Sequence, residues 1–149
     1  MLVKRIITIS LVAFALNFVW EMVQMPLFKG MSLGDLQAWL LCLRSTIGDV
    51  ATVLSFCGLG RVVFRDWDWP GRLSIVKALY LLFVGLTFGI YYEITALSAG
   101  RWSYTELMPV LPGLEVGLVP LVQMMVLPYF SCKFGLKAFR KCTRGPASV

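Results

Sequence analysis

Four acidic residues occur within or beside long apolar stretches of this sequence: Glu21, Asp49, Glu93 and Glu115. An isolated carboxylate in the hydrocarbon of a membrane costs roughly 2.5–3.5 kcal/mol on insertion scales, so such residues normally face other protein groups. Carboxyl groups held close together can differ in protonation, so that one acts as a general acid beside an ionised general base. We expect Glu115 and Glu93 to fill these two catalytic roles.

Residues 100–127 surround Glu115 with aromatic, basic and proline residues, in the run GRWSYTELMPVLPGLEVGLVPLVQMMVL. Together with polar groups elsewhere in the chain, they can form a hydrogen-bonded pocket that opens outward or sideways into the outer leaflet. The aromatic rings would face an apolar or cationic part of a ligand, although Trp and Tyr at this depth also serve as plain interface anchors. The predicted binding residues are Asn17, Trp20, Glu21, Gln24, Arg44, Asp49, Tyr92, Arg101, Trp102, Tyr104 and Gln123.

Histidine is absent from the chain. This absence excludes haem ligation through imidazole, histidine-containing zinc sites and Ser-His or Cys-His catalytic pairs. The four cysteines show no C-x-x-C spacing, so they indicate neither a metal site nor a disulfide framework. We therefore expect no cofactor and no resident metal.

The composition is that of a membrane protein. The 149 residues are 58% hydrophobic and 15% charged, with a mean hydropathy of +0.78, which is too apolar for a soluble domain of this length. We predict one all-α membrane domain, residues 1–149, folded as a four-helix transmembrane bundle with a short interfacial helix at residues 36–43. Transmembrane helices are expected at about residues 6–25, 45–60, 78–97 and 114–132. Pro120 predicts a kink in the last of them, which is expected to end between Pro128 and Cys132.

The basic residues indicate how the chain crosses the membrane. Of the 14 Lys and Arg residues, eleven fall before the first predicted helix, between the second and third, or after the fourth. Only Lys29, Arg44 and Arg101 remain for the other side. This asymmetry predicts cytoplasmic N and C termini in a bacterial inner membrane, and it explains the net charge of +6 without nucleic acid as a partner. The tail, residues 133–149, is then a positive-inside anchor, with an anionic-lipid or partner site as the alternative.

The same orientation predicts that the four acids share one layer. Helices one and three run outward with their carboxylates late, whereas helices two and four run inward with theirs early. Gln123 is expected somewhat deeper, and Arg44 or Arg101 close enough to balance part of the charge. The alternative is that each acid lies separately near an interface, where a carboxylate needs no partner.

Several segments resemble a family of small bacterial four-helix membrane proteins: NFVWEMVQMPLF, STIGDV, YYE and GRWSYTELMPVLPGLEVGLVPLVQ. The resemblance covers most of the chain and implies a membrane location and four helices, but it supplies no reaction. In architecture the chain is more distantly similar to the EXPERA-type sterol isomerase module. It departs from that module in lacking histidine and in motif order, so no catalytic residue is transferred.

Three functions compete at this point. The first is binding of an amphiphilic lipid, isoprenoid-like or sterol-like, with acid–base chemistry on its polar end. The second is cation or proton translocation through the acidic layer, which needs a path across the apolar cytoplasmic half or an oligomer to supply it. The third is a non-catalytic subunit of a homo-oligomer or membrane complex, with Gly85, Gly89, Gly113 and Gly117 providing close helix contacts.

Overall fold

The structure, a computed structural model, describes residues 2–66 and 68–143 and has an all-α fold. Its four long helices are each long and apolar enough to cross a membrane, as predicted, so the chain is a multi-pass membrane protein. The helices are α1 (Leu2–Gln24), α2 (Leu36–Phe64), α3 (Ile75–Ser98) and α4 (Leu118–Thr143). Shorter elements are the 3-10 turns η1 (Met25–Leu27) and η2 (Trp69–Gly71) and a hairpin of β1 (Val110–Leu111) and β2 (Val116–Gly117).

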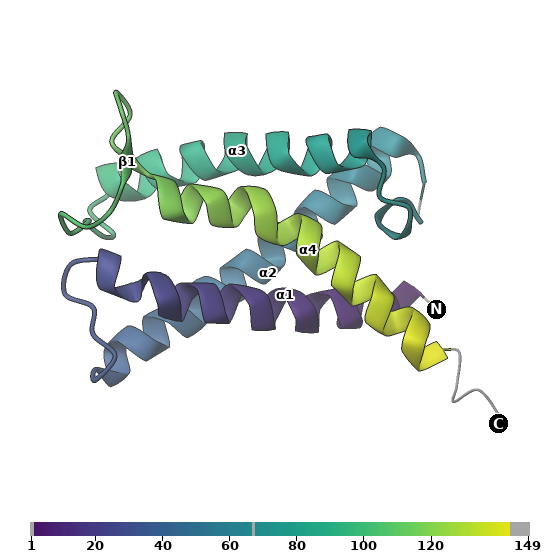
Figure 1. Cartoon of the computed structure of the whole chain (residues 1–149), viewed down its shortest axis with the longest axis horizontal. Coiled ribbons are helices and arrows are strands. Elements are labelled where there is room, and N and C mark those ends of the chain that lie inside the picture. Colours follow the sequence, from purple (N-terminus) through teal and green to yellow (C-terminus); the bar gives the residue numbers. More distant parts are fainter. Residues whose placement is uncertain (1, 67, 144–149) are drawn as a thin grey trace.

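Helix α4 is the centre of the bundle. It lies between α1 and α3 and packs along both, while α2 runs diagonally across the far side of this layer (Figure 1). The start of α1, the end of α4 and the α2–α3 connection lie at one end, which we call the N-terminal end (Figure 1). The β1–β2 hairpin and the α1–α2 connection lie at the other, the hairpin end (Figure 1).

Small residues allow α4 to approach its neighbours closely. A Cβ at Gly85 of α3 would lie 2.2 Å from the carbonyl oxygen of Met124, and one at Gly135 of α4 would lie 2.8 Å from Cα of Ile9. The Met124 carbonyl has no helical donor because Pro128, four residues later, lacks an N–H. The glycine therefore lets α3 cover a backbone group that the proline leaves unpaired. The contacts at Gly85 and Gly135 thus join helices of one chain. Gly113, which was also expected to give a close helix contact, lies instead in a turn with φ +85°.

Helix α2 differs from the prediction. One continuous helix of 29 residues replaces the expected interfacial helix at residues 36–43 and the separate span beginning near residue 45. Asp35 caps its start by accepting a hydrogen bond from the Gln37 N–H at 2.9 Å. Arg44 lies exposed on the helix surface, where a long basic side chain can reach polar surroundings. Asp49 therefore lies near the middle of α2 and not one turn from its end.

Helix α4 also begins and ends later than expected, at Leu118 and Thr143. Pro120 lies in its first turn, where backbone N–H groups have no helical acceptor, so the predicted kink at Pro120 is wrong. Pro128 lies inside the helix and does not end it. The predicted basic tail is thus helical over its first eleven residues, 133–143, and residues 144–149 lie outside the described part.

Candidate functional site

Gln123 of α4 is the hub of a buried polar network near the hairpin end. Its side chain is 1% exposed, and its Nε2 lies 2.9 Å from Asp49 Oδ2, 3.1 Å from Glu21 Oε1 and 3.1 Å from Asn17 Oδ1. A glutamine amide carries two N–H groups, so three acceptors compete for two protons. Gln123, which was expected to lie deeper than the acids, is the residue that connects Glu21 and Asp49.

Gln24 closes the network on α1. Its Nε2 donates to Gln123 Oε1 and to Glu21 Oε1, both at 3.0 Å. Asn17 donates to the carbonyl of Ala13 at 2.8 Å, which orients its oxygen toward Gln123. The spacing of Asn17, Glu21 and Gln24 places all three on one helical face. All three predicted residues of α1 therefore take part in the network.

The carboxyl groups of Glu21 and Asp49 share one donor, because Gln123 Nε2 lies 3.1 Å from Glu21 Oε1 and 2.9 Å from Asp49 Oδ2. Two carboxylates held this close repel each other, and a single proton between them relieves the repulsion. Such a pair can supply an acid and a base side by side.

Glu93 of α3 is the third buried carboxyl and is 4% exposed. Trp102 Nε1 donates to Glu93 Oε2 at 3.3 Å, and the Tyr104 hydroxyl donates to the same oxygen. That hydroxyl in turn accepts the Gly117 N–H at 3.1 Å. Burial raises the pKa of Tyr104, and the hydrogen bond to Glu93 raises it further, so this phenol remains protonated and able to donate.

Aromatic rings surround this carboxyl. The ring of Phe28 lies 5.6 Å from that of Tyr104 and 6.2 Å from that of Trp102, which is 5.8 Å from the ring of Tyr92. Backbone pairing between Phe28 and Tyr104 fixes the segment after α3 against the end of α1. Phe28 was missed by sequence reasoning because it lies in a connection, outside any predicted helix.

The expectation that Glu115 points into the bundle is wrong. It lies exposed in the turn of the β1–β2 hairpin with φ +54°, and its N–H donates to the Leu111 carbonyl at 3.1 Å. Pro112 and Gly113 favour this reversal of the chain, which keeps Glu115 outside α4. Of the four predicted acids, Glu21 and Asp49 meet at Gln123, Glu93 is buried with its own hydrogen-bond partners, and Glu115 lies outside the bundle.

The expected counter-charges also lie elsewhere. Arg44 and Arg101 are both exposed, and the Arg101 guanidinium lies over the Tyr92 ring at 5.8 Å from its centroid. Within residues 2–66 and 68–143, the three buried carboxyls make no ion pair, since the pairs found join Arg5 to Asp68 and Lys77 to Asp66. The described residues also hold no group of three or more His, Cys, Asp or Glu that could bind a metal ion. The partners that the structure gives these carboxyls are hydrogen-bond donors: Gln24, Gln123, Trp102 and Tyr104.

A cavity of about 370 Å³ lies beside the network, between α1 and α4. Two polar atoms of its lining residues, Trp20 Nε1 and Gln24 Oε1, are buried without a hydrogen-bond partner among the described residues. Buried polar atoms are normally paired, and each exception calls for an explanation. The lining residues are Trp20, Val23, Gln24, Leu118, Val119 and Val122.

No protein-family model, curated protein or solved structure matches this chain.

Proposed function

We propose that this protein binds an amphiphilic, isoprenoid-like lipid in the cavity between α1 and α4 and acts on its polar end by acid–base chemistry. The observation that carries the proposal is the pair of unpartnered buried atoms, Trp20 Nε1 and Gln24 Oε1, on residues that line this cavity. One is a donor and the other an acceptor. A lipid hydroxyl, which both accepts and donates, satisfies the two together after small side-chain adjustments.

The cavity walls favour an apolar tail. Val23, Val119 and Val122 line it, and Val23 and Val122 are 75% and 41% exposed on the outer surface of the bundle. That surface faces lipid in a multi-pass protein, so a ligand can enter sideways from the membrane. The ligand class is therefore a lipid with one small polar group and not a water-soluble metabolite.

The chemistry we propose uses the carboxyl pair next to this cavity. Gln24 lines the cavity, and its N–H groups donate to Glu21 and Gln123. Glu21 is thus one side chain away from the ligand, and Gln123 joins it to Asp49. We assign the acid and base roles to Glu21 and Asp49, in place of Glu115, with Glu93 as a third acid held by Tyr104 and Trp102.

Cation or proton translocation finds less support. Toward the N-terminal end, α1, α2 and α4 pack through the apolar cluster Ile9, Ala13, Val53 and Leu136. A transported ion would have to cross these side chains, which offer it no oxygen ligand. The acidic network is therefore better explained as part of a ligand-binding site than as the entrance of an ion-conduction pathway.

Lipid extraction from purified protein tests the binding proposal. We expect a discrete lipid with a hydroxyl or similar polar group to co-purify in mild detergent and to be quantified by mass spectrometry. Trp20→Phe should lower its retention at least about fivefold, because the ligand loses the Nε1 donor while the fold loses no internal hydrogen bond. Val122→Trp should block the cavity, whereas Val19→Trp, on the lipid-facing side of α1 and outside the cavity lining, should retain the lipid. Equal retention by wild type, Trp20→Phe and Val122→Trp would show that this cavity is not the site.

We further propose that the protein lies in a bacterial inner membrane with its N-terminal end at the cytoplasm. The basic residues support this, since eleven of 14 lie at the start of α1, from Arg61 to Lys77 around the α2–α3 connection, or from residue 133 onward. Reporter fusions at Met31 and Gly100 are expected to read outside, and a fusion at Pro70 inside. An inside signal at Gly100 would reverse the orientation.

A further inference from the structure

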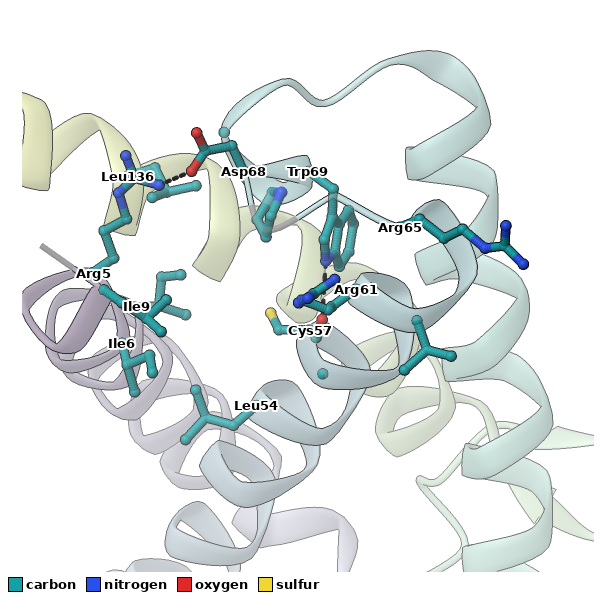
Figure 2. Close-up of a pocket in the computed structure, with 15 residues that line it drawn as sticks. Arg5, Ile6, Ile9, Leu54, Cys57, Arg61, Arg65, Asp68, Trp69 and Leu136 are labelled. Carbon is teal, nitrogen blue, oxygen red and sulfur yellow. Dashed lines mark hydrogen bonds and ion pairs between the residues drawn. The ribbon is translucent and has the colours of Figure 1, made fainter.

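A second and larger cavity, of about 800 Å³, lies at the N-terminal end of the bundle, away from the polar network (Figure 2). Helices α1 and α2 form its two sides, α4 contributes Leu136, and the α2–α3 connection with η2 closes the end (Figure 2). The apolar lining side chains include Ile6, Ile9 and Leu54. The cavity exists because α2 diverges from α1 toward this end of the bundle (Figure 1).

One side of this cavity is rigid and the other is open. The Trp69 ring, 1% exposed, is fixed by its Nε1 hydrogen bond to the Cys57 carbonyl at 2.9 Å, and it packs on Gly60, where a Cβ would lie 2.4 Å from the ring. Gly58, which also lines the cavity, has no atom within 4 Å of the position of a Cβ. The space above Gly58 is therefore unoccupied by protein.

Three arginines and one aspartate line the same cavity, so its charged rim has an excess of two positive charges: Arg5, Arg61, Arg65 and Asp68. Arg5 forms an ion pair with Asp68 through one nitrogen, while its buried Nε has no hydrogen-bond partner among the described residues. The Arg65 side chain extends away from the side of the cavity that Arg5 occupies (Figure 2). Arg5 and Arg61 are thus the guanidinium groups best placed for a ligand.

We propose that this cavity binds an anionic phospholipid, with an acyl chain along Ile6, Ile9 and Leu54 and the phosphate at Arg5 and Arg61. In a membrane, an open apolar cavity between two spanning helices is filled by hydrocarbon and not by water. Guanidinium groups bind phosphate oxygens through strong, charge-assisted hydrogen bonds. The excess positive charge favours a headgroup without an ammonium group, because phosphatidylcholine would bring a cation to the arginines.

This site is independent of the one proposed between α1 and α4, since the two cavities share no lining residue. It also differs from general attraction of basic segments to anionic membranes, which needs charge but no cavity. The two explanations are separated by a variant that fills the cavity without changing charge.

Gly58→Leu is that variant, and Gly48→Leu is its matched control. Both glycines lie exposed in α2 with no atom within 4 Å of a Cβ, but only Gly58 lines the cavity. Purified protein in detergent would be titrated with phosphatidylglycerol, and bound lipid would be counted by native mass spectrometry. We expect Gly58→Leu to weaken binding at least about tenfold and Gly48→Leu to bind as wild type does. Thermal unfolding of both variants checks that each is folded.

Arg61→Gln tests the headgroup contact, with the exposed Arg44→Gln, at the same change of charge, as control. We expect the affinity for phosphatidylglycerol to fall about tenfold in Arg61→Gln and to stay unchanged in Arg44→Gln. A tenfold loss is about the size of one hydrogen bond to a charged group. Phosphatidylcholine should bind at least about tenfold more weakly than phosphatidylglycerol, and excess inorganic phosphate should not displace the lipid. Unchanged binding in Gly58→Leu, equal binding of the two lipids, or displacement by phosphate would each overturn the proposal. If Gly58→Leu does not fold, the Arg61 pair and the lipid comparison still decide it.

Discussion

Replacement of Gln123 by leucine is expected to reduce the free energy of unfolding by about 3 kcal/mol. The substitution keeps the volume of a side chain that is 1% exposed, but it removes the two N–H groups for which Asn17, Glu21 and Asp49 compete and the oxygen that accepts from Gln24. Hydrogen bonds inside membrane proteins average about 0.6 kcal/mol each, so two donated bonds and one accepted bond account for roughly 1.8 kcal/mol. Removing the donor shared by Glu21 and Asp49 adds to this, because a buried charged group without its partner costs more than a neutral one.

Gln37→Leu provides the control for this prediction. Gln37 lies exposed near the start of α2, and its side chain takes no part in the network. Both variants would be measured by equilibrium unfolding in the same detergent. If Gln123→Leu is as stable as Gln37→Leu, the network does not hold α1, α2 and α4 together.

Glu21→Gln is expected to abolish turnover of the lipid while the protein remains folded. The Glu21 oxygen that accepts from Gln24 and Gln123 is retained as an amide oxygen, so those two hydrogen bonds persist. The titrating proton shared with Asp49 is lost. Removing a positioned acid or base lowers a rate by about 100-fold to 10,000-fold, so we expect a fall of at least about 100-fold. The substrate would be a lipid that changes in amount between membranes of cells with and without this protein.

Glu115→Gln separates this proposal from the expectation drawn from sequence. Glu115 lies exposed in the hairpin turn, so the variant should turn over the lipid at the wild-type rate. If Glu115→Gln loses turnover and Glu21→Gln stays active, the acid–base residue is Glu115 in the hairpin and not Glu21. If both variants are active and the lipid is still bound, the protein binds its ligand without acid–base chemistry.

Much of the site could be predicted because helical spacing is a local property. Asn17, Glu21 and Gln24 recur at intervals of four and three residues, which places them on one face whatever the neighbouring helix is. The four helices could likewise be predicted, because each requires only a sufficient run of apolar residues. The position of Glu93 late in α3 follows from the same counting.

The partners of these residues could not be predicted in this way. Asp49 meets Glu21 because α2 is one long diagonal helix, and its tilt depends on packing against α1 and not on the residues around Arg44. The position of Gln123 along the helix predicts its depth in the membrane but not which helix its side chain faces. That depends on how α4 packs between α1 and α3. Phe28 and Tyr104 come together through pairing between two connections, for which apolar periodicity carries no signal.

Composition and periodicity by themselves determined that this protein is a four-helix membrane protein with carboxylates in its helices, because hydropathy and helical spacing act over a few turns of one chain segment. Only the tertiary structure decided which carboxylates meet. The Pro112–Gly113 turn removes Glu115 from the bundle, whereas Gln123 gathers Glu21 and Asp49 from two other helices. Hydrogen bonds of this kind join residues 74 and 102 positions apart, and their geometry exists only after the helices have packed.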